Sequence, residues 1–332
     1  MRLLLNLFWI GVVCAIVIGV GVGWFAMEIS VPASEVAEPV VFQVEPGATG
    51  RSVAAKLEEE ELIVNGLAFR LLLSYYEKQR GSALQAGYFK VDPRKDIKGV
   101  LADLLSGDPL TRKATIPEGY VKSQVARSLE EQDVVDAQEF GEALETADLG
   151  WEFPSNLEGY LFPSTYEFPY ECTGLDAVRQ MTNQFRIVVK PMLEKYPQKP
   201  LSLKETVILA SLVEREAQVP SERPLIAGVY INRINRGMKL ECDATVQFAL
   251  GKQKEVLLYR DLEISSPYNT YRYKGLPPGP ICSPGAASLE AAFNPKKSDY
   301  LFYVRNDIKN DGSHVFGRNF SEHQANINKY QK

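Results

Sequence analysis

Uncharged residues dominate the first part of the chain. The 25 residues from Leu3 to Met27 contain no Asp, Glu, Lys or Arg. A helix of that length rises about 1.5 Å per residue and exceeds the roughly 30 Å hydrocarbon core of a bilayer, so a membrane-spanning helix is predicted within residues 1–30. A cleaved signal peptide is the alternative. Its apolar region is only about 7–15 residues long, however, and the small residues around Ala33 lie beyond the run.

The charges that flank this span have opposite signs. Arg2 and the amino terminus precede it, whereas Glu28, Glu35 and Glu38 follow it. Positive charge is retained on the cytoplasmic side of a membrane. We therefore expect a single-pass protein of the cytoplasmic membrane, with its amino terminus inside and the remaining residues exported.

One pattern of apolar positions occurs three times after a polar tether at 31–40. A short strand with alternating apolar residues is followed by a proline and then by apolar positions at helical spacing. The three copies are 41–57, 87–105 and 113–129. A further helix is predicted within 58–80, and from about Glu130 the chain is mainly helical. The pattern predicts an α+β protein, with a strand–helix subdomain at 41–112 and a mainly helical domain with short strands at 113–332.

A capping pattern marks the start of the most informative helix. Ser202 is followed three positions later by Glu205. At this spacing each side chain satisfies a free backbone amide near the other residue. The sequence therefore predicts a helix over 202–218.

Glu216, near the end of this helix, lies on its apolar stripe. At about 100° per residue, its neighbours on that stripe are Leu209, Leu212 and Val213. Glu214 points to nearly the opposite side, so the two acids do not face each other. A carboxyl group on an apolar stripe is desolvated, which raises its pKa and keeps it protonated, as a general acid requires. The alternative is a solvated helix end, or an ion pair with Arg215 or Arg223.

Composition excludes several classes of protein. Of 332 residues, 45% are hydrophobic and 24% charged, which is typical of a folded chain. The net charge is -5 and no long run of Lys or Arg occurs, so nucleic acid is not an expected partner. There are only two histidines and no HExxH, CxxC or GxSxG motif. Zinc proteases, zinc ribbons, thioredoxin-like enzymes and serine hydrolases are thus excluded, and the expected chemistry depends on carboxylates.

Three cysteines follow the span: Cys172, Cys242 and Cys282. An odd number allows at most one disulfide among them, and buried free thiols are the favoured interpretation.

Polar side chains alternate with aromatic ones between 266 and 285. Tyr268, Asn269 and Thr270 precede a rigid turn from Gly275 to Gly279. Sugars offer hydroxyl edges and apolar ring faces, so this mixture is typical of a sugar-binding groove. A packed turn whose tyrosine hydroxyls are satisfied locally is the alternative.

Several long motifs in fixed order resemble the YceG-like family of membrane-anchored endolytic murein transglycosylases of bacteria. They are IPEGY (116–120), EGYLFPSTYEF (158–168), LASLVEREA (209–217), SERPLIAGVYINRI (221–234), GMKLECDATV (237–246), SPYNTYRYKGLPPGPICSPG (266–285) and HVF (314–316). The resemblance implies that 41–112 is a LysM-like subdomain that holds glycan. It also implies that 113–332 is the catalytic domain, on the periplasmic or extracytoplasmic side of the bacterial inner membrane.

The resemblance also implies a lyase reaction. In the family, the second Glu of an E-x-E pair is the catalytic acid, and that position is Glu216 here. It would cleave the β-1,4 bond between N-acetylmuramic acid and N-acetylglucosamine and leave 1,6-anhydro ends. The family positions expected to line the groove are Glu222, Asn232, Asp243, Thr245, Tyr268, Asn269 and Thr270. No metal or organic cofactor is implied.

The substrate implied by the resemblance is peptidoglycan, whose strand length the enzyme would set beside penicillin-binding and other glycan-synthesising proteins. The chain departs from the family where Glu241-Cys242-Asp243-Ala244-Thr245 replaces the frequent Q-[ST]-D-P-T. Two alternatives remain. One is a noncatalytic wall-binding scaffold, and the other is a hydrolase with Glu222 or Asp243 as a second carboxylate.

Overall fold

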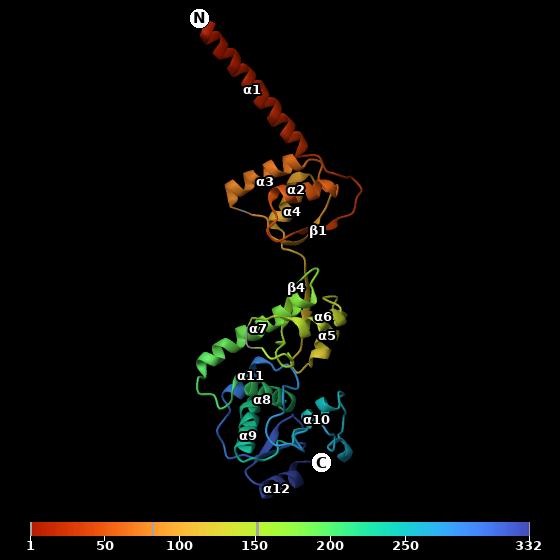
Figure 1. Ribbon diagram of the computed structural model, residues 1–332, viewed down its shortest axis with the longest axis vertical. Coiled ribbons are helices and arrows are strands. Elements are labelled where there is room, and N and C mark those ends of the chain that lie inside the picture. Colours follow the sequence, from red (N-terminus) through yellow and green to blue (C-terminus); the bar gives the residue numbers. More distant parts are fainter. Residues whose placement is uncertain (1, 82, 151–152, 332) are drawn as a thin grey trace. The chain divides into compact units, whose positions relative to one another are not determined.

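The fold combines helices with short strands, as predicted. The computed structural model describes residues 2–81, 83–150 and 153–331 (Figure 1). Met1 and Lys332, the outer limits of the first and last predicted domains, lie outside the described residues. The chain divides into two compact units. Unit 1 holds the residues up to Arg112 together with Pro169–Glu171, and unit 2 holds Lys113–Phe168 and the residues from Cys172 onward.

Helix α1, Arg2–Glu28, confirms the prediction of an N-terminal apolar helix. Among the described residues it is the single helix long and apolar enough to cross a membrane, over Phe8–Glu28 with a mean hydropathy of 2.4. The next residue, Ile29, is buried in the core of unit 1, and Phe25 packs against the same core. Helix α1 therefore enters unit 1 without a spacer.

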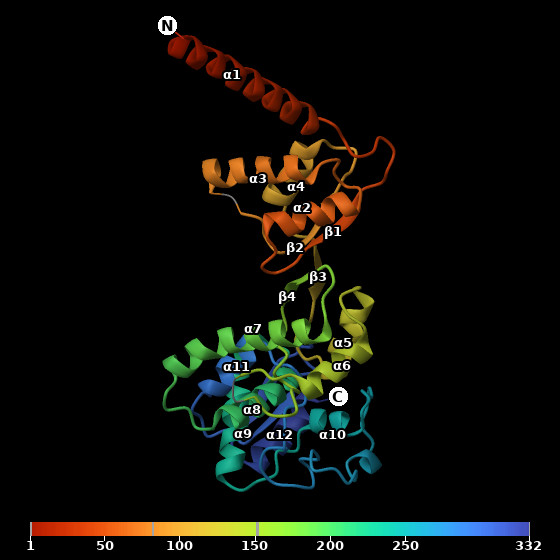
Figure 2. The same ribbon diagram turned by 45° about the horizontal axis from the view of Figure 1, so that its top comes forward.

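Unit 1 is built around one antiparallel pair of strands. The two strands are β1 (Val40–Val44) and β2 (Gly87–Val91), and the helices that follow α1 are α2 (Gly50–Glu59), α3 (Gly66–Arg80) and α4 (Ile97–Ser106). Val40 pairs with Val91 and Val44 with Gly87, so the predicted copies at 41–57 and 87–105 share one sheet. The alternating positions of both strands, such as Phe42 and Phe89, meet the helices in a single core. Both views place α3 at the end of unit 1 where α1 joins it (Figures 1 and 2).

Unit 2 is mainly helical. Its helices are α5 (Lys122–Glu131), α6 (Ala137–Thr146), α7 (Gly174–Lys195), α8 (Leu203–Glu216), α9 (Arg223–Asn235), α10 (Asp243–Ala249), α11 (Ala286–Phe293) and α12 (Phe320–Tyr330), with short 3-10 turns at Pro220–Glu222 and Tyr259–Asp261. Two two-stranded sheets complete the fold. Strand β3 (Thr111–Thr115) pairs with β4 (Thr165–Pro169), and most residues of both strands belong to unit 2. Strand β5 (Phe302–Arg305) pairs antiparallel with β6 (His314–Gly317) within unit 2. In the second sheet Phe302 pairs with Gly317 and Arg305 with His314.

Helix α8 lies in the centre of unit 2. Ser202 and Glu205 form the predicted capping box at its start. Every residue from Thr206 to Val213 is buried, because α9, α10 and α11 pack around the helix. The last turn, which carries Glu216, reaches solvent again, and close packing of the turns before it fixes its position.

Candidate active site

Glu216, the last residue of α8, lies at the centre of a set of hydrogen-bonding side chains. The Tyr303 hydroxyl on β5 donates to Glu216 Oε2 at 2.9 Å. The Cys242 thiol, just before α10, donates to Glu216 Oε1 at 3.3 Å. Each carboxylate oxygen thus accepts one hydrogen bond, while the residue keeps part of its surface exposed.

A second tyrosine extends this set. The hydroxyls of Tyr230, on α9, and Tyr303 are 2.9 Å apart, and Tyr230 also interacts with Cys242. Tyr230, Tyr303, Glu216 and Cys242 therefore form a closed ring of polar contacts. We call these four residues the Glu216 ring. Tyr230 and Cys242 are each 1% exposed, so water does not compete for most of these bonds.

Burial raises the pKa of the Glu216 carboxyl group. The hydrogen bonds from Tyr303 and Cys242 oppose this rise, the nearby charge of Asp243 adds to it, and His314 opposes it. Burial also raises the pKa of the Tyr303 hydroxyl and of the Cys242 thiol well above their usual values. The two donors therefore remain protonated, and the carboxyl group of Glu216 is the acidic group of the ring.

Glu214 points away from the ring, as predicted, and holds a loop. Its Oε2 accepts a hydrogen bond of 2.9 Å from the backbone N–H of Gly285, and its Oε1 lies 3.6 Å from Arg223. A Cβ atom at position 285 would meet the carboxylate of Glu118, which would have to move aside to accept any other residue there. The first acid of the E-x-E pair thus connects α8 to the start of α11.

Asp243, Thr245 and Thr270 all lie close to the ring. The Tyr271 hydroxyl donates to Asp243 Oδ1 at 2.5 Å. The Thr245 hydroxyl donates to the Cys242 carbonyl at 2.7 Å, and Thr270 Oγ1 accepts from the Cys242 N–H at 3.0 Å. Because both threonines are buried and bonded to its backbone, they fix Cys242 beside Glu216.

Glu222 forms a second polar pair near the ring. Its carboxylate accepts from the His314 N–H at 3.0 and 3.1 Å, and its Oε2 lies 2.8 Å from His314 Nδ1. The His314 ring packs edge-on against Tyr303, with centroids 5.2 Å apart. Glu222 therefore holds His314 against Tyr303 of the Glu216 ring.

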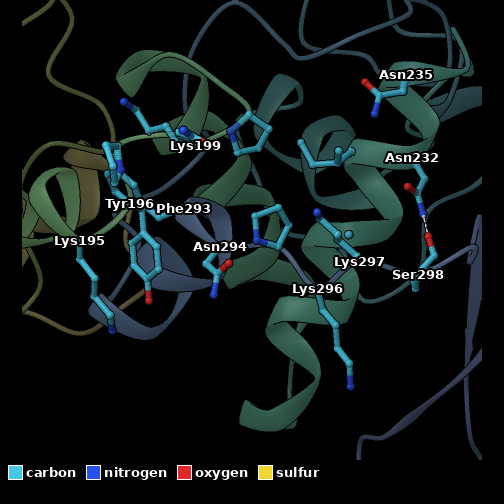
Figure 3. A pocket seen from close by; sticks show the side chains of 16 residues that line it. Lys195, Tyr196, Lys199, Asn232, Asn235, Phe293, Asn294, Lys296, Lys297 and Ser298 are labelled. Atoms are coloured by element: carbon cyan, nitrogen blue, oxygen red, sulfur yellow. Dashed lines mark hydrogen bonds between the residues drawn. The ribbon is translucent and has the colours of Figure 1, made fainter.

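Asn232 lies in a different part of unit 2. It lines a pocket of about 710 Å³ together with lysines and prolines of 195–200 and 294–298 (Figure 3). Its amide nitrogen donates to the carbonyls of Ser298 at 2.7 Å and Tyr300 at 2.8 Å. The residues that line this pocket do not include Glu216. The structure thus brings Asp243, Thr245 and Thr270 to the ring and separates Asn232 from it.

Asn269 and Tyr268 belong to the loop before Thr270. The Asn269 amide is buried and donates to the carbonyls of Leu262 and Ile264 at 2.8 and 2.9 Å. Tyr268 is half-buried and stacks at a tilt on Phe248, with centroids 4.8 Å apart. Both side chains shape the loop, and their contact with substrate stays a prediction.

Sequence reasoning did not assign roles to Tyr230, Tyr303 and Cys242 at the site. Tyr230 lies within the quoted motif at 221–234, and nothing in that motif indicates a contact with Glu216. Cys242, for which a buried free thiol was favoured, is indeed a free thiol, as are Cys172 and Cys282. The only signal for Cys242 was its place beside Asp243 in a quoted motif. Within 2–81, 83–150 and 153–331, no three His, Cys, Asp or Glu side chains gather as a metal ion would require.

Comparisons with known proteins find relatives over most of the chain. An endolytic murein transglycosylase of Bacillus subtilis is 33% identical over 311 residues, which cover 88% of this chain and 84% of that protein. A protein of the same name from Streptococcus pneumoniae is 30% identical, and the match covers 87% of this chain but only 58% of the relative. The crystal structure of a YceG-like protein from Listeria monocytogenes has 28% sequence identity and a TM-score of 0.57, over 87% of this chain and 99% of that one. The model of the YceG-like family matches residues 42–329, and the chain therefore belongs to this family.

Proposed function

We propose that this protein is a peptidoglycan lytic transglycosylase that cleaves glycan strands internally, with Glu216 as its single acid and base. The observation that carries the proposal is the Glu216 ring. One desolvated carboxyl group with a raised pKa is held by two neutral donors at the end of a rigid helix. The relatives named endolytic murein transglycosylase support the same class of reaction.

In the first step, Glu216 gives its proton to the oxygen that joins C1 of N-acetylmuramic acid to C4 of N-acetylglucosamine. The C1–O bond breaks, the electron pair leaves with that oxygen, and positive charge develops at C1. Glu216 becomes a carboxylate. The hydroxyl of Tyr303 and the thiol of Cys242 stabilise this new charge, because their bonds to it strengthen when it is ionised.

In the second step, the C6 hydroxyl of the same muramyl residue attacks C1 and passes its proton to the Glu216 carboxylate. A 1,6-anhydro ring closes, water is not consumed, and the acid is restored. The nucleophile belongs to the substrate and is present at high effective concentration, so a second enzyme carboxylate is not required.

The partners of the other two acids support a mechanism with one carboxylate. Glu222 accepts hydrogen bonds from His314, and Asp243 accepts one from Tyr271. A hydrolase would need one of them as a nucleophile or as a base that activates water. Both are held by protein groups instead. Of the two acids, Asp243 influences Glu216 directly, because its charge raises the pKa of Glu216.

The remaining parts of the proposal concern location and substrate binding. Helix α1 would cross the inner membrane once, with the amino terminus in the cytoplasm, and would keep the enzyme beside nascent strands and the proteins that synthesise them. The compact β1–β2 pair with α2 and α3 supports a LysM-like role for 41–112 in holding glycan.

The test is mass spectrometry of the products that the full-length protein releases from peptidoglycan and from uncrosslinked glycan. Wild type is compared with Glu216→Gln, a nearly isosteric change, and with Glu194→Gln, which alters an exposed acid on α7. We expect internal fragments with 1,6-anhydromuramyl ends from wild type and from Glu194→Gln, and none from Glu216→Gln.

Each other outcome identifies an alternative. Products with water added at the new end would indicate a hydrolase and would direct attention to Asp243 and Glu222. Full cleavage by Glu216→Gln would remove Glu216 from the chemistry. No cleavage of either substrate by any variant, together with retained glycan binding, would indicate a wall-binding scaffold.

A further inference from the structure

Helix α3 carries an apolar stripe on its outer face. Leu67, Leu71 and Tyr75 are spaced four residues apart and are 52%, 49% and 59% exposed. This spacing places them one above another on the helix surface. The opposite face fills the core of unit 1 with Ala68, Phe69, Leu72 and Leu73. A helix that is apolar on both faces is typical of one with an additional apolar neighbour.

The position of α3 indicates which neighbour this is. Helix α3 lies at the end of unit 1 where α1 joins it (Figures 1 and 2). Its outer face is the one opposite the core residues. Ile29 is in the core immediately after α1 ends, and Ser30 accepts a hydrogen bond of 3.3 Å from Lys98 on α4. No flexible segment therefore separates the end of α1 from the unit that contains α3.

We propose that Leu67, Leu71 and Tyr75, here called the α3 stripe, lie in the interfacial layer of the bilayer that α1 crosses. The inference rests on the membrane anchor in the proposed function. If α1 spans the bilayer, the membrane surface lies within a few residues of Ile29. An apolar stripe that faces this surface is removed from water by the acyl boundary, in the manner of interfacial amphipathic helices.

Charge around the stripe indicates how the contact is stabilised. Arg70 and Lys78 of α3 favour an anionic surface, but the four glutamates at 58–61, just before the helix, oppose it. Burial of apolar area, rather than attraction to anionic lipid, therefore stabilises the contact. The contact is expected to form in zwitterionic and anionic bilayers alike.

The test places a nitroxide spin label on the stripe of the full-length protein in phosphatidylcholine nanodiscs. Leu67→Cys, Leu71→Cys and Tyr75→Cys are labelled one at a time in a Cys14→Ala background, because the other three thiols are buried. Lys90→Cys on β2, an exposed position, is the matched control. A label on native Cys14 tests the anchor itself. Collision of each label with oxygen, which concentrates in lipid, is compared with collision with a water-soluble nickel chelate.

We expect high oxygen and low nickel accessibility at 67, 71 and 75, and the reverse at 90, with circular dichroism equal to that of wild type. High nickel accessibility on the stripe would overturn the proposal in favour of a solvated helix. Low accessibility to both reagents would overturn it in favour of a protein neighbour, such as a second copy of the chain. If Cys14 is itself outside lipid, the anchor fails together with the inference. If Cys14 is in lipid and the stripe is not, only the inference fails.

Discussion

Replacing Tyr303 by phenylalanine removes one hydroxyl from the Glu216 ring and keeps the aromatic packing. The lost group donates to Glu216 at 2.9 Å and contacts the Tyr230 hydroxyl at 2.9 Å. The aromatic side chain of Tyr303 packs edge-on against Tyr230 and His314, and phenylalanine preserves both contacts. The substitution therefore tests the hydrogen bond rather than the fold.

The size of the effect follows from the kind of bond that is lost. A hydrogen bond to a charged group contributes about 1.5–3 kcal/mol. This bond strengthens when Glu216 gives up its proton, so most of that energy is lost from the transition state. At about 1.36 kcal/mol per tenfold in rate, kcat falls by about tenfold to about a hundredfold.

The pH dependence moves in a direction that a purely structural defect would not produce. The Tyr303 hydrogen bond lowers the pKa of Glu216 by favouring its ionised form. Its removal raises that pKa further. The basic limb of kcat/KM, which reports loss of the acid's proton in the free enzyme, therefore moves to higher pH.

The assay is the rate of anhydro-end formation between pH 4 and pH 10, measured by mass spectrometry on uncrosslinked glycan. Tyr300→Phe is the control, since it removes a hydroxyl from the same segment at a residue that hydrogen-bonds through its backbone carbonyl and N–H. Equal kcat and an unmoved basic limb in Tyr303→Phe would refute the role assigned to this hydroxyl. A lower kcat with an unmoved limb would limit Tyr303 to holding the shape of the site.

Three further predictions concern the supports of the site. Cys242→Ser keeps a donor beside Glu216 and should retain cleavage within about tenfold of the wild-type rate. Cys242→Ala should lower kcat more, because a neutral donor is lost. Equal rates in the two variants would argue against the thiol as a donor. Burial raises the pKa of Glu158 from 4.5 to about 7, so the folded state binds this proton more tightly than the unfolded state does. The free energy of unfolding should therefore fall by up to about 3 kcal/mol as pH rises from 4.5 through 7. Urea titrations should show this fall in wild type and not in Glu158→Gln, and parallel pH profiles would contradict it. Gly228→Ala would place a Cβ against the Lys296 carbonyl oxygen and should destabilise unit 2 by about 1–3 kcal/mol. An unchanged melting temperature would show that the loop at Lys296 moves aside without cost.

Local patterns predicted the helix that carries Glu216 and its orientation. The Ser202–Glu205 capping box and the apolar periodicity are properties of neighbouring residues, and both appear in α8 as expected. The opposite directions of Glu214 and Glu216 follow from helix geometry alone. These features needed no knowledge of the rest of the chain.

The partners of Glu216 depend on contacts between distant parts of the sequence. Tyr303 is 87 residues away and Cys242 is 26 residues away along the chain. No periodicity in either segment indicates which side chain reaches the carboxylate. The same limit applies to the repeated strand–helix pattern, because only the register of Val40 with Val91 shows that the first two copies share one sheet.

The role of Asn232 could not be predicted from its residue type or from its position in a family motif. The resemblance places Asn232 among the residues that line the groove, and in the structure it lies near the end of α9, at Asn235. Its amide, however, is used to fasten the loop at Ser298 and Tyr300 to that helix. An amide side chain suits both a sugar and a backbone carbonyl, so residue type alone does not separate the two roles.

The three buried thiols of unit 2 can report on local opening of the folded protein. Cys172, Cys242 and Cys282 are 7%, 1% and 0% exposed, so an alkylating reagent reaches each one only after a local opening. Cys172 precedes α7, Cys282 lies against the Ser211 carbonyl of α8, and Cys242 adjoins Glu216. The rate of alkylation at each sulfur therefore measures the opening free energy of a different place in one molecule. Protection of Cys242 alone by added glycan would identify the opening that admits substrate.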